Sequence, residues 1–454
     1  MDVSTLAGSV RGSVLRPDDE GYAEEVAAFN LSRHHTPDVV VVPRSADDVV
    51  ATVRWAGEND LPVSVQATGH GAVLPITEGV LVSTRGLDEL AIDPERRTAR
   101  VGAGVKWRRV IDAAAEVGLA GLCGSTSDVG VIGYTLGGGL PLLGRAYGFS
   151  SDHVRSIDVV TGDGRLHHVE TGDGSELDWA LRGGKGNLGV VTAMEVELFA
   201  IPDLYGGAVF WPGALAPTLL PAFVEWTKTL PDDFSASISL LRLPPLPEVP
   251  EPLRGQFTVH LRVAYVGSDA DGERLLAPMR AVAPPMIDLV GRMPYVELDR
   301  IHMDPEHPVP FEEGGMVLRE MGPDTIATIL EHAGPDTRCP LLLVEVRLMG
   351  GALARAHDDA VGGRDAAYTL FAVGALMPPI ADAVPGAISS LMAACAPWST
   401  GGTMVNFHGV PGDAADRARP WPPATFERLQ RAKATHDPAN LFRFGHSIPV
   451  LDPA

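Results

Sequence analysis

The sequence has few cysteines and no long apolar run. It contains 3 cysteines, Cys123, Cys339 and Cys395, which are odd in number and far apart, so neither a disulfide framework nor a zinc site is expected. No stretch reaches the roughly twenty uninterrupted apolar residues of a membrane-spanning helix. Residues 1–22 show no basic segment followed by an apolar one, as a secretory signal would. We therefore expect a reduced, cytoplasmic protein without membrane partner or bound metal.

Basic residues are also scarce. The 454 residues, enough for two or three domains, include 58 acidic and 36 basic side chains, a formal net charge of −22. A surface of this sign repels phosphates, so nucleic acid is not expected as a partner. If such a chain binds a dinucleotide, backbone amides and helix N-termini must hold most of the pyrophosphate charge.

Glycine is abundant and concentrated in one stretch, GSTSDVGVIGYTLGGGLPLLGRAYG, over residues 124–148. Gly137, Gly138 and Gly139 bring consecutive bare amides together, and such amides can form a nest for an anionic group. The spacing fits neither GxGxxG nor GxxxxGK[ST]. The alternative is a glycine-rich turn between two buried segments.

A second stretch, LPVSVQATGHGA over residues 61–72, ends in a histidine between two glycines. Residues 62–65 favour a short strand, and Gly69, His70 and Gly71 favour a turn. His70 has no large apolar neighbour in sequence. It is either a surface histidine or a functional one, because loops carry both kinds.

Hydrophobic periodicity predicts an α+β fold. Strands are expected at residues 36–42, 80–83, 99–101, 154–161, 166–170 and 190–199, and helices at residues 22–30, 46–59, 106–117 and 426–435. RGGKGNLG, with Gly183, Gly184, Gly186 and Gly189, repeats the glycine-rich pattern. Near residue 201 prolines become dense, and runs at 257–264 and 341–348 alternate as strands do. These runs indicate a second domain with an antiparallel sheet.

Five motifs occur in an order that resembles the berberine-bridge-enzyme-like branch of the FAD-linked oxidases, with a flavin domain of the vanillyl-alcohol-oxidase or p-cresol-methylhydroxylase type. They are PDVVVVPRSADDVVATVRWAGENDLPVSVQATGHG, TARVGAGVKWRRV, SDVGVIGYTLGGG, WALRGGKGNLGVVTAMEVEL and HDPANLFRFGHSIP. The resemblance implies FAD as cofactor. It also implies a two-part FAD-binding domain, residues 1–200 and 416–454, around an inserted α+β substrate domain, residues 201–415, built on an antiparallel sheet.

The resemblance further implies which residues meet the cofactor. His70 occupies the place of a histidine bonded covalently to the flavin. Many relatives have a second bond from a cysteine, whose position here is Thr126, so single attachment is expected. Cys123 lies three residues too early and is expected to be buried. The other implied FAD contacts are Gln66, Ala67, Thr68, Gly69, Gly71, Ser127, Asp128, Val129, Gly130, Gly133, Tyr134, Gly137, Gly138, Gly139, Gly189, Val190, Val191, Asn406 and His446.

The catalytic base is open. The family often has a tyrosine two residues before the asparagine that matches Asn406, and Met404 at this place cannot take a proton. Glu345 is the first candidate, because a carboxylate desolvated on an otherwise apolar strand has a raised pKa. Arg347, two residues on, shares its face and favours a structural ion pair instead. The other candidates are Tyr368, His408 and His302.

The resemblance implies an FAD-dependent oxidoreductase. We expect an oxidase of a bulky small molecule or natural-product intermediate of secondary metabolism, in which a hydride passes to flavin N5 and dioxygen reoxidises the flavin. Two alternatives stay open. One is a cyclase or isomerase that uses flavin as a scaffold without net redox, and the other is a dehydrogenase with another acceptor. The sequence indicates neither the substrate nor the oligomeric state.

Overall fold

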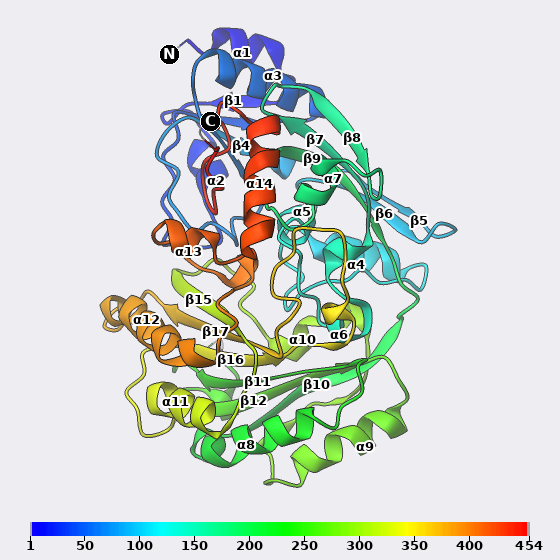
Figure 1. Cartoon of the computed structure of the whole chain (residues 1–454), viewed down its shortest axis with the longest axis vertical. Coiled ribbons are helices and arrows are strands. Elements are labelled where there is room, and N and C mark those ends of the chain that lie inside the picture. The colour runs from blue at the N-terminus through cyan, green and yellow to red at the C-terminus, as the bar shows by residue number, and fades with distance from the viewer. Residues whose placement is uncertain (1, 248, 452–454) are drawn as a thin grey trace.

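Three sheets organise residues 2–247 and 249–451, which the computed structural model describes (Figure 1). The first sheet has the order β1 (Ser13–Leu15), β2 (Val39–Val42), β4 (Val80–Ser83) and β3 (Val63–Gln66). The second has the order β5 (Leu90–Asp93), β6 (Thr98–Gly102), β9 (Gly189–Glu197), β7 (Val154–Thr161) and β8 (Leu166–Glu170). The third has the order β13 (Ile287–Asp288), β10 (Asp203–Pro212), β12 (Phe257–Tyr265), β11 (Phe234–Arg242), β16 (Leu343–Leu348), β17 (Tyr368–Ala375) and β15 (Phe311–Leu318), and β14 (Gly291–Pro294) pairs with β10.

Helices cover these sheets and connect their strands. They are α1 (Ser4–Ser9), α2 (Tyr22–Val26), α3 (Ala46–Glu58), α4 (Trp107–Ala115), α5 (Val131–Thr135), α6 (Gly144–Tyr147), α7 (Glu176–Leu181), α8 (Ala216–Thr227), α9 (Asp269–Arg280), α10 (Asp299–His302), α11 (Pro323–Ala333), α12 (Val384–Cys395), α13 (Ala414–Ala418) and α14 (Pro423–His436). Within the described residues, we find no helix with the length and apolar character needed to cross a membrane. The expected mixed fold with antiparallel sheets is confirmed.

Helix α3 shows how the sequence determines the first part of the fold. Ser45 caps it by accepting a hydrogen bond from the Asp48 amide at 3.3 Å, which satisfies one of the free N–H groups at a helix start. Val49, Val53 and Ala56 are fully buried at the spacing of one helix face. The helix packs against β7 and β9. It thereby joins the first sheet to the second, close to the predicted range 46–59.

Helix α2 is shorter than predicted. The pattern predicts a helix over residues 22–30, whereas α2 ends at Val26 and Ala27 is extended. The reason is a tertiary contact, because the Phe29 amide donates to the carbonyl of Thr68 at 2.9 Å. This contact attaches the N-terminal region to the loop that carries His70.

The eight-stranded sheet has one apolar face and one charged face. Val344, Val346 and Leu370 lie on the first face and pack into a core shared with α8, α9, α11 and α12, which Figure 1 shows away from the first two sheets. The intervening residues, among them Glu345 and Arg347, lie on the opposite face. This period-2 alternation directs the charged face toward the first part of the chain.

The C-terminal segment returns to the first part of the fold, where α14 packs against α7. The Lys433 ammonium, fully buried, donates to the carbonyls of Asn187 at 2.9 Å and Phe442 at 2.8 Å and pairs with Asp437 at 2.5 Å. Asp437 also accepts from the amides of Leu441 and Phe442 at 2.8 and 3.0 Å. Burial lowers the pKa of Lys433, and Asp437 opposes this shift. This buried pair fixes the segment that follows α14.

The predicted domain boundaries, after residue 200 and after residue 415, stay a prediction. Between Glu197 and Asp203 the chain leaves the five-stranded sheet and enters the eight-stranded one. The return from that sheet ends in α13 and α14.

We predict that Lys433→Met lowers the free energy of unfolding by about 3–5 kcal/mol, because it leaves the Asp437 carboxylate buried without a cation. Urea denaturation measures the loss. Lys228→Met is the matched control, since Lys228 pairs with Glu225 at 2.6 Å on an exposed surface, where such pairs contribute about 0–1 kcal/mol. Equal losses in the two variants would contradict the structural role of Lys433.

Candidate functional site

A cavity of about 430 Å³ lies between the first part of the chain and the charged face of the eight-stranded sheet. Its walls come from the end of β3 and the loop of His70, from residues 124–136, from residues 185–191, from β15 to β17, and from residues 405–407 and 442–446. The volume falls in the usual range for cofactor and ligand pockets. Segments far apart in sequence therefore form one ligand-sized site.

His70 lies in the turn after β3 with its ring against Phe29, the two ring centroids 3.7 Å apart. Its Nδ1 lies 2.8 Å from Thr68 Oγ1, whereas Nε2 is buried, has no hydrogen-bond partner among the described residues, and lies 4.0 Å from the Asp128 carboxylate. Burial lowers the pKa of His70 to about 4, although Asp128 opposes the shift. The ring is therefore neutral at pH 7 and keeps one nitrogen free.

Most of the predicted cofactor contacts line this cavity. Gly133 and Gly186 are open to it, because a Cβ at either position would meet no atom within 4 Å. Side chains at these two glycines would fill space that the backbone leaves free. The predicted residues that line the cavity are Gln66, Ala67, Thr68, Gly69, His70, Gly71, Val129, Gly130, Gly133, Tyr134, Gly189, Val191, Asn406 and His446.

The triple glycine is not among the residues that line the cavity, so the anion-binding nest predicted there stays a prediction. A Cβ on Gly137 would lie 2.1 Å from Asn406 Oδ1, and a Cβ on Gly139 would lie 2.6 Å from the ring of Tyr134. Gly138 and Gly139 have φ values of +93° and +71°, which only glycine adopts at low cost. These residues form a tight turn that lets Asn406 and Tyr134 approach, as the alternative interpretation held.

Ser127, Asp128 and Val190 also lie outside the cavity wall. Ser127 donates from its amide and hydroxyl to Asp299 at 2.7 and 2.6 Å, which joins the first part of the chain to α10. Asp128 accepts from Lys106 at 2.6 Å. Val190 is fully buried in the core. Direct contact of these three side chains with a cofactor is therefore not supported.

The eight-stranded sheet supplies a wall whose individual residues the sequence did not predict. Phe311 and Glu313 from β15, Arg347 from β16 and Phe371 from β17 line the cavity together with Phe407. The rings of Phe371 and Phe407 lie 4.8 Å apart, and the Arg347 guanidinium lies 5.6 Å from the centre of the Phe407 ring. This wall combines aromatic rings with the charged side chains of Glu313 and Arg347.

Other lining residues were also missed as contacts. Ser125, Lys185 and Asn187 line the cavity, as does Thr126 at the place of the second cysteine. In the sequence FEEGGMVL of β15, alternate residues share one face of the strand. This alternation was the available signal that Glu313 lies on the same face as Phe311. The charged residue in the glycine run RGGKGNLG was the available signal for Lys185.

Glu345 does not have the raised pKa expected of a base. Its carboxylate accepts from Arg262 at 2.9 Å and from Arg347 at 2.9 Å, and His302 Nε2 lies 3.6 Å away. The two arginines hold its pKa well below the usual range despite complete burial. The prediction of a raised pKa is wrong, and the structural ion pair with Arg347 is confirmed. A second cavity of about 30 Å³, bounded by Arg262, His302 and Arg347, has room for a water molecule at this network.

Tyr368 and His408 do not line the cavity either. The Tyr368 hydroxyl lies 2.8 Å from Thr227 Oγ1, on the sheet face covered by α8. His408 Nε2 lies 3.3 Å from the Asp416 carboxylate, and burial lowers its pKa. Met404 is buried in an apolar cluster. The structure therefore supports none of the proposed bases, and it gives no reason to place one at Met404.

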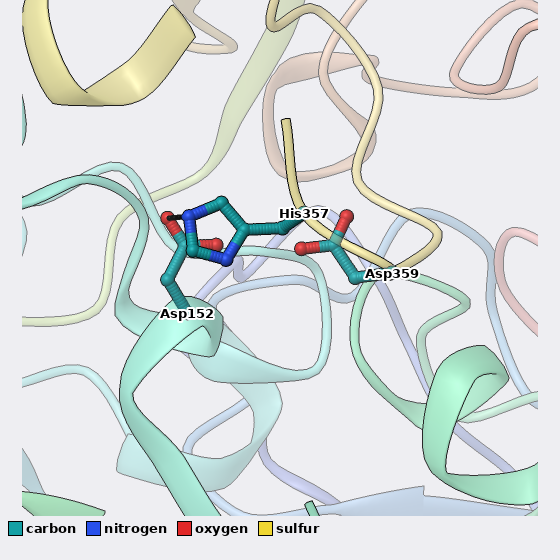
Figure 2. A group of neighbouring side chains, drawn as sticks. All are labelled: Asp152, His357 and Asp359. Atoms are coloured by element: carbon teal, nitrogen blue, oxygen red, sulfur yellow. Dashed lines mark ion pairs between the residues drawn. The ribbon is translucent and has the colours of Figure 1, made fainter. Parts of the chain in front are cut away.

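A separate cluster brings together Asp152, His357 and Asp359, as Figure 2 shows. His357 Nε2 lies 3.7 Å from Asp152 Oδ2. The Arg364 guanidinium pairs with both carboxylates, and Asp152 also accepts from the Phe149 amide at 2.8 Å. Because a guanidinium already bridges the carboxylates, we propose no metal site in this cluster.

Two family profiles match the chain. The profile described as "FAD binding domain" matches residues 37–170, which contain the His70 loop. The profile described as "Berberine and berberine like" matches residues 423–449, which contain α14 and the cavity-lining residues 442–446. The two matches flank the eight-stranded sheet in sequence.

Individual proteins resemble the chain over most or much of its length. Uncharacterized FAD-linked oxidoreductase YgaK of Bacillus subtilis is 27% identical over 464 residues, 97% of each chain. (R)-6-hydroxynicotine oxidase of Paenarthrobacter nicotinovorans is 29% identical over 64% of this chain and 62% of its own length. The solved structure of glucooligosaccharide oxidase from Acremonium strictum, with 6-S-cysteinyl, 8α-N1-histidyl FAD, covers 98% of both chains with a TM-score of 0.85 and 18% identity. This last likeness shows a shared fold.

We predict that Gly133→Leu lowers the flavin content several-fold without unfolding the protein, because the leucine side chain would occupy the cavity. Flavin absorbance per folded chain is the measurement, with folding checked by circular dichroism. Gly8→Leu is the matched control, since Gly8 is also a helical glycine with no atom within 4 Å of a Cβ, but on an exposed face of α1. Full flavin content in Gly133→Leu would show that the cofactor does not use this wall.

Proposed function

We propose that the chain belongs to the berberine-bridge-enzyme-like branch of the FAD-linked oxidoreductases and that it is an oxidase of a small organic molecule with dioxygen as electron acceptor. When bound, FAD accepts a hydride from the substrate and passes its electrons to the acceptor. The chain binds the cofactor, orients the substrate and excludes water. The dehydrogenase and the scaffold cyclase or isomerase remain the alternatives.

The observation that carries this proposal is the single cavity shared by the two parts of the fold. The glycines and His70 of the FAD-binding part form one side, and the phenylalanines of the eight-stranded sheet form the other. A substrate held against Phe311 or Phe371 therefore lies in the same space as the cofactor. Such positioning is the main contribution of a protein to cofactor chemistry.

The residues of the cavity fit FAD attached at one point. His70 has a neutral ring with a buried, unpaired nitrogen, which suits a covalent bond to the flavin. Thr126 lies at the cavity wall and has no thiol for a second bond. The buried Cys123 thiol has a pKa raised far above its ordinary value by desolvation, so it is a poor nucleophile. We propose that His70 is the single attachment point.

The wall of the sheet favours a substrate with an aromatic or otherwise flat apolar part. Phe311, Phe371 and Phe407 offer three rings, and aromatic groups pack well against such surfaces. The name of (R)-6-hydroxynicotine oxidase indicates an aromatic substrate for that relative. We propose a comparable class here, with an oxidisable C–H beside an amine or a hydroxyl.

We predict that the flavin stays on the protein after acid precipitation and maps to the peptide that contains His70. His70→Ala should release all of its flavin in acid. His446→Gln is the control and should keep its flavin in acid. His446 also lines the cavity, but its Nε2 already forms a hydrogen bond with the Gly409 carbonyl at 3.1 Å. Mass spectrometry that finds flavin on Cys123, or on no peptide, would exclude attachment at His70.

We predict hydrogen peroxide formation with an aromatic amine or alcohol and anaerobic bleaching of the flavin by the same compound. The probes are (R)-6-hydroxynicotine and a glucooligosaccharide, and the aromatic wall favours the first. Bleaching without peroxide in air would identify a dehydrogenase. A product formed without bleaching would identify the cyclase or isomerase alternative.

A further inference from the structure

Glu313 and Lys185 are two titratable side chains of the cavity to which no function has been assigned so far. Glu313 lies on β15, two residues after Phe311 and therefore on the same face of the strand, and both line the cavity. Lys185 lies on the opposite side, in the glycine run before β9. The two side chains enter the same space from the two parts of the fold.

Glu313 differs from its neighbour Glu312 in having no partner. Glu312 points to the other face of β15 and pairs with Arg33 at 2.7 Å. Among the described residues, none forms a hydrogen bond or an ion pair with the Glu313 carboxylate. Burial, together with the smaller effect of the Glu312 charge, raises the pKa of Glu313 to about 8, although Lys185 and Arg33 oppose the shift. An unpaired carboxyl with this pKa exchanges its proton near neutral pH.

Lys185 lines the cavity and has an unusual backbone conformation. Its φ is +63°, a value that residues other than glycine rarely adopt. Residues with such backbone conformations cluster at functional sites. The Lys185 Nζ donates to the Gly133 carbonyl at 3.0 Å and to Asn406, and it would lie 3.9 Å from a Cβ on Gly71. Burial lowers its pKa to about 8, and Glu313 opposes the shift. The amine therefore lies beside the His70 loop, and the charges of Lys185 and Glu313 act on each other's pKa.

The other titratable residues of the cavity are unsuited to take a proton. Arg347 is a permanent cation. Desolvation raises the pKa of Tyr134 well above its ordinary value, so its hydroxyl stays protonated. His446, with a pKa lowered to about 3 mainly by burial, is bonded to Gly409, and His35 Nδ1 accepts from the Ile76 amide at 3.0 Å. His70 is the proposed attachment point of the flavin. Glu313 on β15 is therefore the remaining candidate for the proton acceptor.

We propose that Glu313 accepts the substrate proton during oxidation and that Lys185, a positioning residue, stabilises the ionised carboxylate across the cavity. This inference rests on the proposed oxidase function. The substrate loses a hydride, with its two electrons, to FAD, while the proton of its hydroxyl or amino group passes to a Glu313 oxygen and leaves a carbonyl or imine. The hydride and this proton account for the two hydrogens of the hydrogen peroxide formed with dioxygen. Glu313 thus takes the role that Met404 cannot take.

The first test is anaerobic stopped-flow reduction of the flavin across pH, with the (R)-6-hydroxynicotine or glucooligosaccharide probe that reduces it faster. Because only ionised Glu313 accepts a proton, the wild-type rate rises with pH and levels off above about 8. Glu313→Gln reduces the plateau by about 100- to 10,000-fold and removes this pH dependence, and Glu313→Asp restores part of both. An unchanged rate and profile in Glu313→Gln would overturn the proposal.

Variants of two charged residues near Glu313 distinguish loss of the proton acceptor from a change in its pKa. Glu312→Gln removes a negative charge that raises the Glu313 pKa, so the midpoint moves to lower pH while the plateau stays. Lys185→Met removes a cation that lowers this pKa, so the midpoint moves to higher pH. A plateau lost in Lys185→Met but kept in Glu313→Gln would assign the proton transfer to Lys185 and overturn the proposal.

The second test needs no substrate. Infrared difference spectra of the holoenzyme across pH should show the carbonyl stretch of a protonated carboxyl group that disappears near pH 8 in the wild type and is missing in Glu313→Gln. If neither probe bleaches the flavin but the band titrates, the oxidase function fails for these substrates while the chemistry of Glu313 stands. If the probe bleaches the flavin and the band is missing in the wild type, the role of Glu313 fails.

Discussion

The buried charges on the charged face of the eight-stranded sheet must be paired, and this need determines how the side chains around the cavity are arranged. An unpaired charge in such a place costs several kcal/mol, so Glu345 is surrounded by Arg262, Arg347 and His302. With one side of the Arg347 guanidinium held by Glu345, the arginine is fixed where its other side meets the cavity and Phe407. The network that stabilises the sheet thereby also shapes the wall opposite the cofactor.

A few buried polar contacts hold the parts of the chain around that wall. Ser127 bonds to Asp299, and Lys433 binds Asp437 together with the carbonyls of Asn187 and Phe442. Each contact joins segments more than a hundred residues apart or fixes a segment that lines the cavity. Hydrophobic burial stabilises the layers, whereas these directional contacts determine where the layers meet.

Local patterns predicted the fold well and the site in part. Alternation predicted β16 and the pairing of Glu345 with Arg347, and the TGHG turn directed attention to His70, which lines the cavity. The triple glycine was ambiguous in the sequence because positive φ serves equally for an anion nest and for a close approach of Tyr134. Glu313 and Lys185 were missed because their importance depends on a tertiary meeting of β15 with the glycine run. The local signals of FEEGGMVL and RGGKGNLG place each residue on its own element but do not show that the two elements meet.

The return of the C-terminal segment has a consequence for biosynthesis. Residues 442–446 form part of the cavity wall, and α14 reaches its place only after the intervening sheet has been made. A ribosome-bound chain that has exposed the His70 loop therefore still lacks one side of the pocket. Cofactor loading is therefore tied to synthesis of residues 442–446, so the acquired yellow colour reports that this segment has been made and has reached its place.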